Sequence, residues 1–358
     1  MSAVLTMARD PRHLWWFGAP AGLVCVVLAI TQGAYAITLD DLPRLWAWWW
    51  RPEGAPFDPA HTAAQVFWHI RAPRLLMAGL AGAALGVSGA MIQGLFRNPL
   101  ADPGLIGVSA GGALGAASCI VLLPLLGLSA SGLAGSLSGT LATMVCAFVG
   151  GVLVTALAWR LSHTQGQVHL ATLLLVGLAI NALAMAGLGL LTYLASDTQQ
   201  RALNFWLLGS LAPSQWPTVL AVLPPVLLAG LGARGLSAPL DALALGEAQA
   251  RTMGVNVRRL QVRCVGLTAL AVGAVTAVIG MVGFIGLLAP HLVRLVLGPR
   301  HRVVLPGAAL TGACLVLLAD TAARTVAAPV ELPLGVLTGL LGAPVFLYLL
   351  RQARPRTH

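Results

Sequence analysis

Lysine is absent from this sequence of 358 residues, because all 21 of its Lys and Arg positions are arginine. The GxxxxGK[ST] loop that grips nucleotide phosphates needs a lysine, so the chain cannot hydrolyse ATP by that route. Charge is scarce as well: only 9% of the residues are charged, whereas about a quarter are charged in an ordinary soluble domain. This second shortage excludes a soluble globular protein.

Clusters of metal-binding or proton-carrying residues are missing too. The five cysteines lie far apart inside apolar stretches without a CxxC spacing, and no HxxxH pair brings two histidines onto one helix. We therefore expect no bound metal ion. No apolar stretch contains the series of acids or histidines that a proton-coupled pump uses. A stand-alone secondary transporter is thus disfavoured and stays the alternative of another class.

Apolar runs dominate what is present, since 58% of the residues are hydrophobic. A membrane-spanning helix needs about 20 mostly apolar residues, and the sequence offers ten candidate runs, of which the eighth is too short to cross alone. The runs are residues 14–36, 75–95, 105–126, 133–159, 170–194, 216–231, 260–280, 284–297, 303–323 and 332–350. We predict an all-α polytopic membrane protein with about ten transmembrane helices and a single domain over residues 1–358.

The arginines predict the orientation of these spans. If the N-terminus is cytoplasmic, ten spans return the C-terminus to the same side; the outer segments then hold six arginines and the inner segments the other fifteen. This bias follows the rule that cytoplasmic loops are rich in Lys and Arg. Segment 38–70 is then periplasmic, and its tryptophans predict a short helix on the membrane surface.

Polar pairs mark the predicted outer side. Arg71 and Arg74 bracket Pro73, and lipid phosphate, nearby acids or carboxylates of a soluble protein would all satisfy them. Asp320 and Arg324 are four residues apart, which places both on one helix face. A structural ion pair and a docking role fit this second pair equally well.

The longest inner loop, residues 238–258, has an amphipathic pattern, and its glycines are expected to divide it into two short helices. The predicted apolar ridge consists of Leu243, Leu245, Ala248 and Met253. Acidic residues interrupt the basic face that a helix lying on the membrane would use. We therefore expect a docking surface for a cytoplasmic partner.

Small residues recur every fourth position within several runs. The spacing occurs at Gly82 and Gly86, at Gly107, Gly111 and Gly115, and at Gly335 and Gly339. Such faces let helices pack closely. We expect packing here rather than a glycine-lined conduit.

Three stretches together resemble one known family. They are RAPRLLMAGLAGAALGVSGAMIQGLFRNPLADPGLIGVSAGGALG at 71–115, ALALGEAQARTMGV at 242–255, and GFIGLLAPHLVRLVLG from 283, continued by LLADTAARTVAAPVELPLGVLTGLLGAPVFLYLL up to 350. They are similar to the permease subunits of ABC importers for iron chelates, haem and cobalamin. The strings RNPLADPGLIGVS and ELPLGVLTGLLGAP are specific to that group.

The resemblance implies an assembly as well as a fold. Members have ten spans, form a homodimer with the substrate path on the two-fold axis, and lie in the bacterial inner membrane. They bind two cytoplasmic ATPase subunits, which use ATP and Mg, and receive substrate from a periplasmic binding protein. The permease itself is then no enzyme and holds no tightly bound cofactor.

The resemblance also assigns roles to three groups of residues. The ATPase-coupling group is Leu243, Leu245, Glu247, Arg251, Met253 and Gly254. The group that docks the binding protein is Arg71, Arg74 and Arg324. The gate and path group is Asn98, Leu100, His169, Leu170, Ala171, Asn181 and Met185.

The substrate is indicated by TYLASDTQQRALNFWLLGSL at 192–211. This stretch is most similar to the haem-importing members, which also carry an aspartate, an arginine and FW before GSL. The siderophore and cobalamin permeases share its tryptophan and glycine. We therefore expect haem as the transported substrate, with a ferric siderophore or cobalamin as the alternatives.

Overall fold

The structure, a computed structural model, describes residues 12–33, 35, 37–41, 43, 45–46, 62–125, 137–164, 167–168 and 170–353. Within these residues, seven helices are long and apolar enough to cross a membrane, and three shorter apolar helices join them. They match the ten predicted runs, and the eighth is short as expected, with 13 residues. Their bounds are α2 Arg12–Thr31, α5 Ala72–Phe96, α6 Val108–Leu125, α7 Leu137–Leu161, α8 Leu170–Leu194, α10 Trp216–Arg234, α13 Val257–Ile279, α14 Ile285–Leu297, α15 His301–Thr325 and α16 Leu334–Ala353.

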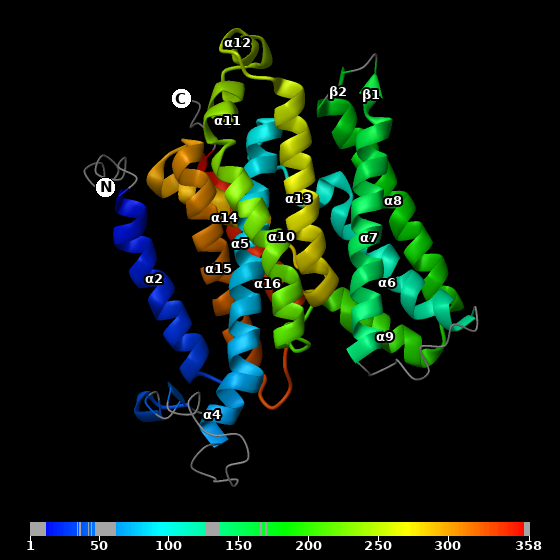
Figure 1. Cartoon of the computed structure of the whole chain (residues 1–358), viewed down its shortest axis with the longest axis vertical. Helices are drawn as coiled ribbons and strands as arrows, with labels where there is room; N and C mark the ends of the chain where they lie inside the picture. The colour runs from blue at the N-terminus through cyan, green and yellow to red at the C-terminus, as the bar shows by residue number, and fades with distance from the viewer. Residues whose placement is uncertain are drawn as a thin grey trace.

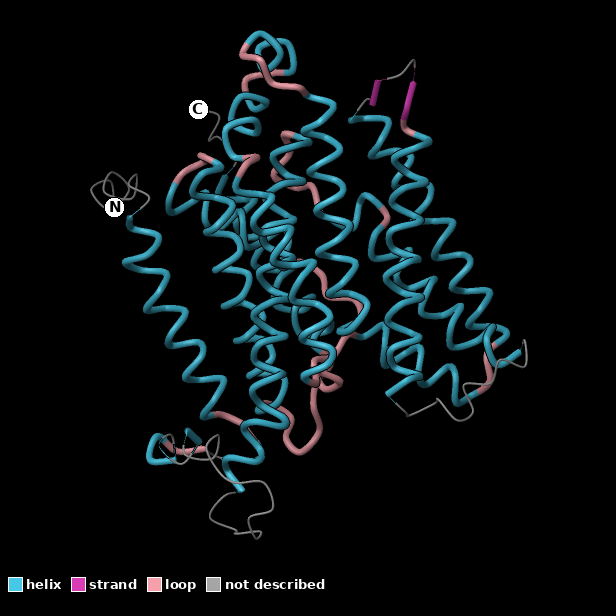
Figure 2. Tube along the Cα trace, in the orientation of Figure 1, coloured by secondary structure: helices cyan, strands magenta, loops and turns pink. Residues whose placement is uncertain are grey.

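Short elements connect these helices. They are η1 Leu39–Asp41, α4 Thr62–Val66, the π-helical η3 Phe67–Arg71, η4 Pro103–Ile106, β1 His163–Thr164, β2 Gln167–Val168, α9 Asp197–Leu208, α11 Ser237–Ala244 and α12 Glu247–Thr252. The two strands pair as an antiparallel hairpin between α7 and α8 (Figure 2). This hairpin is the one departure from the predicted all-α fold among the described residues.

The helices form a central group with a second group beside it (Figure 1). The central group contains α5, α10, α13, α14 and α15, while α6, α7, α8 and α9 lie to one side and α2 to the other. Helix α13 joins the groups, because it packs against both α5 and α7. Apolar runs adopt helices here because only a helix satisfies its backbone groups internally in the absence of water.

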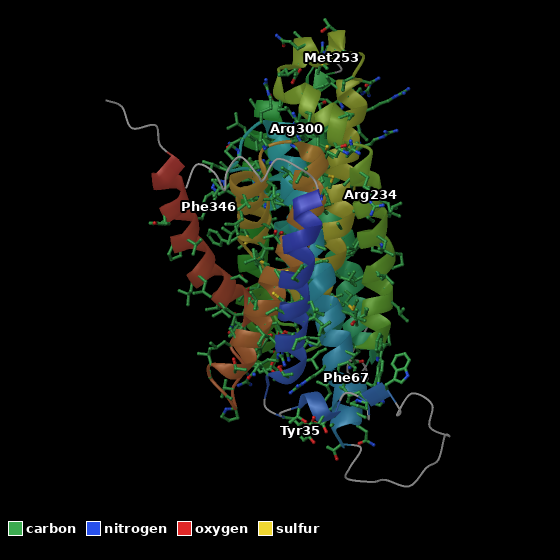
Figure 3. All side chains as sticks on the ribbon, turned by 90° about the vertical axis from the view of Figure 1, so that its left-hand side faces the viewer. Tyr35, Phe67, Arg234, Met253, Arg300 and Phe346 are labelled. Atoms are coloured by element: carbon green, nitrogen blue, oxygen red, sulfur yellow. The ribbon has the colours of Figure 1, made fainter. Side chains whose placement is uncertain are left out.

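The two ends of the molecule carry different elements. One end holds α11, α12 and the β-hairpin, and the opposite end holds α4 and α9 (Figure 1). Met253 lies at the first end and Tyr35 and Phe67 at the second (Figure 3). We call these the inner and outer ends, following the predicted orientation. The described start of α2 and end of α16 both point toward the inner end.

Helices α5 and α15 touch backbone to backbone. A Cβ atom on Gly82 would lie 2.1 Å from the carbonyl oxygen of Gly312, and one on Gly86 would lie 2.0 Å from that of Ala308. Neither position accepts a side chain unless the helices move apart. Such close approach is a main source of helix association in lipid, which is as apolar as leucine. The predicted packing face at Gly82 and Gly86 is confirmed.

The other glycine pairs behave differently from one another. A Cβ on Gly115 would lie 2.2 Å from the carbonyl oxygen of Cys146, so α6 packs closely on α7. A Cβ on Gly335 would lie 2.5 Å from the carbonyl oxygen of Met281. A Cβ on Gly339 would meet nothing within 4 Å. The packing predicted for Gly339 is therefore not found within the described chain.

Replacing Gly86 with alanine is expected to destabilise the detergent-purified protein by about 1–3 kcal/mol, as at other overpacked sites, because the new methyl group collides with the Ala308 carbonyl. The matched control is Gly79→Ala on the same helix, where a Cβ meets nothing within 4 Å. Thermal unfolding followed by circular dichroism measures both variants. Equal melting temperatures would contradict the packing described for α5 and α15.

Candidate functional site

Five charged side chains gather at the outer end, and we call them the outer cluster. They are Arg71 at the end of η3, Arg74 in the first turn of α5, Asp320 and Arg324 near the end of α15, and Glu331 in the loop before α16. Three arginines face two acids, so the cluster carries one net positive charge. It joins residues 71–74 to residues 320–331, two stretches that are far apart in the sequence.

Asp320 is the centre of the outer cluster, with a side chain only 5% exposed. Its carboxylate accepts a hydrogen bond from Arg74 Nε at 2.9 Å and another from Arg324 Nε at 3.0 Å. A carboxylate this deep would cost several kcal/mol without partners, and bonds between charged groups are the strong ones. The ion pair between Asp320 and Arg324 considered from their spacing is thus present.

Arg74 holds a second carboxylate, that of Glu331. Arg74 Nη1 donates to Glu331 Oε1 at 2.9 Å, and Nη2 donates to Oε2 at 3.0 Å. These two parallel bonds form the bidentate arrangement typical of arginine and carboxylate. Sequence reasoning missed Glu331 as a site residue. Its one signal was its position in the family-specific string ELPLGVLTGLLGAP.

Arg71 is satisfied by the backbone instead of by an acid. Its Nη1 group donates to the carbonyl oxygen of Ile30, at the end of α2, and its Nη2 group donates to that of Tyr35, just beyond the helix. Gly33 lies against this guanidinium group: its φ is 150°, and a Cβ there would lie 2.7 Å from Arg71 Nη2. Only glycine adopts this conformation readily at such a close approach.

The three arginines of the outer cluster are largely buried. Arg71 is 5% exposed and Arg74 is 8% exposed, and the Arg324 side chain is 10% exposed. They are buried because each has partners within the chain. Glu331, with its side chain 44% exposed, is the accessible member of the cluster. Docking of a binding protein here stays a prediction.

At the inner end, α11 and α12 are two short helices separated at Gly246, as the loop pattern predicted. Leu245 is 64% exposed and Met253 is 62% exposed, and Ala248 is exposed as well. Leu243 is fully buried in the core. Its predicted place on the exposed ridge is therefore wrong, because the face of α11 that carries it packs onto the bundle.

Two polar side-chain pairs occur in this inner loop. Glu247 Oε2 and Arg251 Nη2 lie 3.6 Å apart on the surface of α12. An exposed ion pair of this type contributes little stability. Asp241 Oδ1 lies 2.7 Å from His301 Nδ1, and the His301 backbone N–H donates to the same oxygen at 2.9 Å. Since His301 begins α15, these bonds fix α11 to α15. Sequence reasoning missed this pair because no local pattern connects its members.

The loop after α5 contains the predicted gate residues Asn98 and Leu100, both exposed. Asn181 of α8 reaches this loop, because its Nδ2 donates to the Gly104 carbonyl at 3.1 Å. Burial raises the pKa of the Asp102 carboxyl, and the hydrogen bond that it accepts from the Gly104 amide at 2.7 Å opposes that shift. A predicted path residue thus contacts the predicted gate loop.

The other predicted gate and path residues lie along α8. Leu170 is half-buried, Ala171 is exposed, and Met185 is 46% exposed, while His169 lies outside the described residues. Their role in a path stays a prediction. Among the residues that the structure describes, no three His, Cys, Asp or Glu side chains are grouped so that they could hold a metal ion.

Comparison with known proteins yields a family and two kinds of relative. The profile of the FecCD transport family matches residues 21–352. The hemin transport system permease protein HmuU of Yersinia pestis is 48% identical over 301 residues, covering 82% of this chain and 86% of the relative. The vitamin B12 import system permease protein BtuC of Shigella boydii is 38% identical over 360 residues, covering 98% of this chain and 100% of the relative.

A solved structure has the same fold along the whole chain. It is described as an inward-facing conformation of a metal-chelate type ABC transporter, and it matches with a TM-score of 0.81 at 30% sequence identity. The match covers 96% of this chain and all of the other. The fold is therefore that of an ABC transporter permease.

Replacing Asp320 with asparagine is expected to destabilise the protein by about 3 kcal/mol or more, as when one partner of a buried ion pair is removed. Two guanidinium groups then lose their shared carboxylate. Asp197→Asn is the matched control, because Asp197 is exposed at the outer end and loses the same charge. Thermal unfolding in detergent measures both variants. A melting temperature of Asp320→Asn equal to that of the wild type would contradict a structural role for Asp320.

Proposed function

The chain belongs to the FecCD transport family, and we propose that it is the permease that carries haem across the bacterial inner membrane at the expense of ATP hydrolysed by separate subunits. The observation that carries the choice of haem is the 48% identity to a hemin permease over 82% of this chain. Haem is flat, largely apolar and anionic at its propionates. An aliphatic path suits such a molecule.

A second substrate class has an observation of its own. The vitamin B12 permease of Shigella boydii is similar over 98% of this chain, a longer match than that of the hemin permease. A permease for cobalamin, or for a ferric siderophore, would use the same mechanism. These substrates are the alternatives to haem.

The inner end is proposed to bind the ATPase. Leu245, Ala248 and Met253 form an exposed apolar surface at the tips of α11 and α12, beside Glu247 and Arg251. Apolar side chains in this position favour insertion into a groove of a partner. The Asp241–His301 bonds would pass movement of this surface to α15.

The membrane-facing surface is proposed to include the contact with a second copy. Helix α8 exposes Leu175, Leu178 and Leu183, and α16 exposes Leu340 and Leu347. Lipid or another apolar helix must cover such a surface. A homodimer that brings α8 and α16 together around a two-fold axis would form the substrate path, and alternation between two states with different contacts would move the substrate.

Replacing Leu245 and Met253 with aspartate is expected to abolish copurification of the ATPase, because a charge then enters the apolar contact. Both side chains are largely exposed, so the permease itself stays folded and keeps its melting temperature. The control is Arg302→Asp, which changes another exposed residue at the inner end. Retention of the ATPase by the double variant would remove these residues from the coupling surface.

Deletion of the gene is expected to abolish growth of an iron-starved strain on haem alone. Parallel cultures receive a ferric siderophore, or cobalamin where that vitamin is required, and these cultures should grow as the parent strain does. A plasmid copy of the gene is the control for polar effects. Intact growth on haem with loss on another supply would replace haem by that substrate while the importer mechanism is kept.

A further inference from the structure

Arg74 binds two carboxylates, those of Asp320 and Glu331, which differ in their access to water. The Asp320 side chain is 5% exposed and is also held by Arg324, so release from Arg74 would leave its charge without water. The Glu331 side chain is 44% exposed and is bound by Arg74 in the outer cluster. Water can solvate Glu331 when it leaves, which makes its release far less costly than that of Asp320.

We propose that Glu331 is a displaceable carboxylate that occupies Arg74 until an acidic side chain of the docking protein replaces it. The inference rests on the proposed importer function and on the expectation, from the family resemblance, that a periplasmic binding protein docks on the outer cluster. Glu331 uses both Nη atoms of Arg74, so an incoming carboxylate can form the same bidentate pair only after Glu331 leaves. The exchange replaces one bidentate pair with another of the same kind.

The position of Glu331 gives its release a consequence within the permease. The next residues are tied to two other elements: Leu332 N–H donates to the Ala323 carbonyl at 3.0 Å, and Leu334 N–H donates to the Gly209 carbonyl at 2.9 Å. Gly209 directly follows α9, and Leu334 begins α16. The Glu331–Arg74 pair therefore restrains the short segment that links the outer cluster to α9 and α16. Loss of this pair on docking would make the segment more mobile.

The variant Glu331→Gln tests the exchange, because the amide keeps the size of the side chain but binds Arg74 without charge. Affinity for the haem-loaded periplasmic binding protein is measured by biolayer interferometry, with the permease and its ATPase in lipid nanodiscs. We expect binding to tighten about fivefold, the upper range for a partly exposed ion pair. Asp197→Asn, with the same charge change at the outer end, is expected to alter affinity less than about twofold, because exposed charges are screened.

Different outcomes would contradict the exchange at Glu331 and the docking on which it depends. If the wild type binds and Glu331→Gln binds no more tightly than Asp197→Asn, the exchange is overturned while docking stands. If the wild type does not bind, the predicted docking at the outer end fails and the exchange fails with it. Weaker binding together with a lower melting temperature would identify Glu331 as a structural brace and also overturn the exchange.

A second measurement applies if Glu331→Gln does not fold. A spin label at Val330→Cys, a position that is 67% exposed in the same loop, reports the mobility of the segment before α16. We expect its spectrum to change on addition of the binding protein to the otherwise wild-type complex. An unchanged spectrum at saturating binding protein would overturn release of Glu331.

Discussion

The contact between α5 and α15 is the constraint on which the remaining structure depends. In its middle the backbones touch at Gly86, so no side chain separates the helices. At the outer end Arg74 binds Asp320 across the contact. At the inner end His301 lies against Gly94, where a Cβ would be 2.4 Å from its Nε2. Close packing in the middle, a buried ion pair at the outer end and the close contact of His301 with Gly94 at the inner end make these helices one unit.

Both candidate surfaces are attached to this unit. The outer cluster belongs to it directly, and the inner surface is joined to it because Asp241 of α11 binds the first residue of α15. Helix α16 packs less extensively on α15 than α5 does and diverges from the bundle toward the inner end (Figure 3). Alternation needs contacts that differ between two states. Such changes are less costly in α16 and its preceding loop than between α5 and α15.

The sequence was sufficient for the helices but insufficient for the partners of the site residues. Apolar runs predicted the ten apolar helices, seven of which are long enough to cross a membrane, because hydropathy over about 20 residues is a local property. The Asp320–Arg324 pair followed from helical spacing, whereas Arg74 binds Glu331 across 257 positions of sequence. Leu243 matched an amphipathic pattern, yet packing of α11 buries it. Family resemblance assigned roles to residues, and only the fold indicated what they contact.

The most direct test of the account is uptake of iron-labelled haem into proteoliposomes that contain this permease with its ATPase. Haem is offered outside on its binding protein, and ATP is sealed inside with the ATPase subunits. The account predicts uptake that requires both ATP and the binding protein and that does not respond to a proton gradient. Uptake driven by a proton gradient without ATP would contradict it and favour a stand-alone secondary transporter.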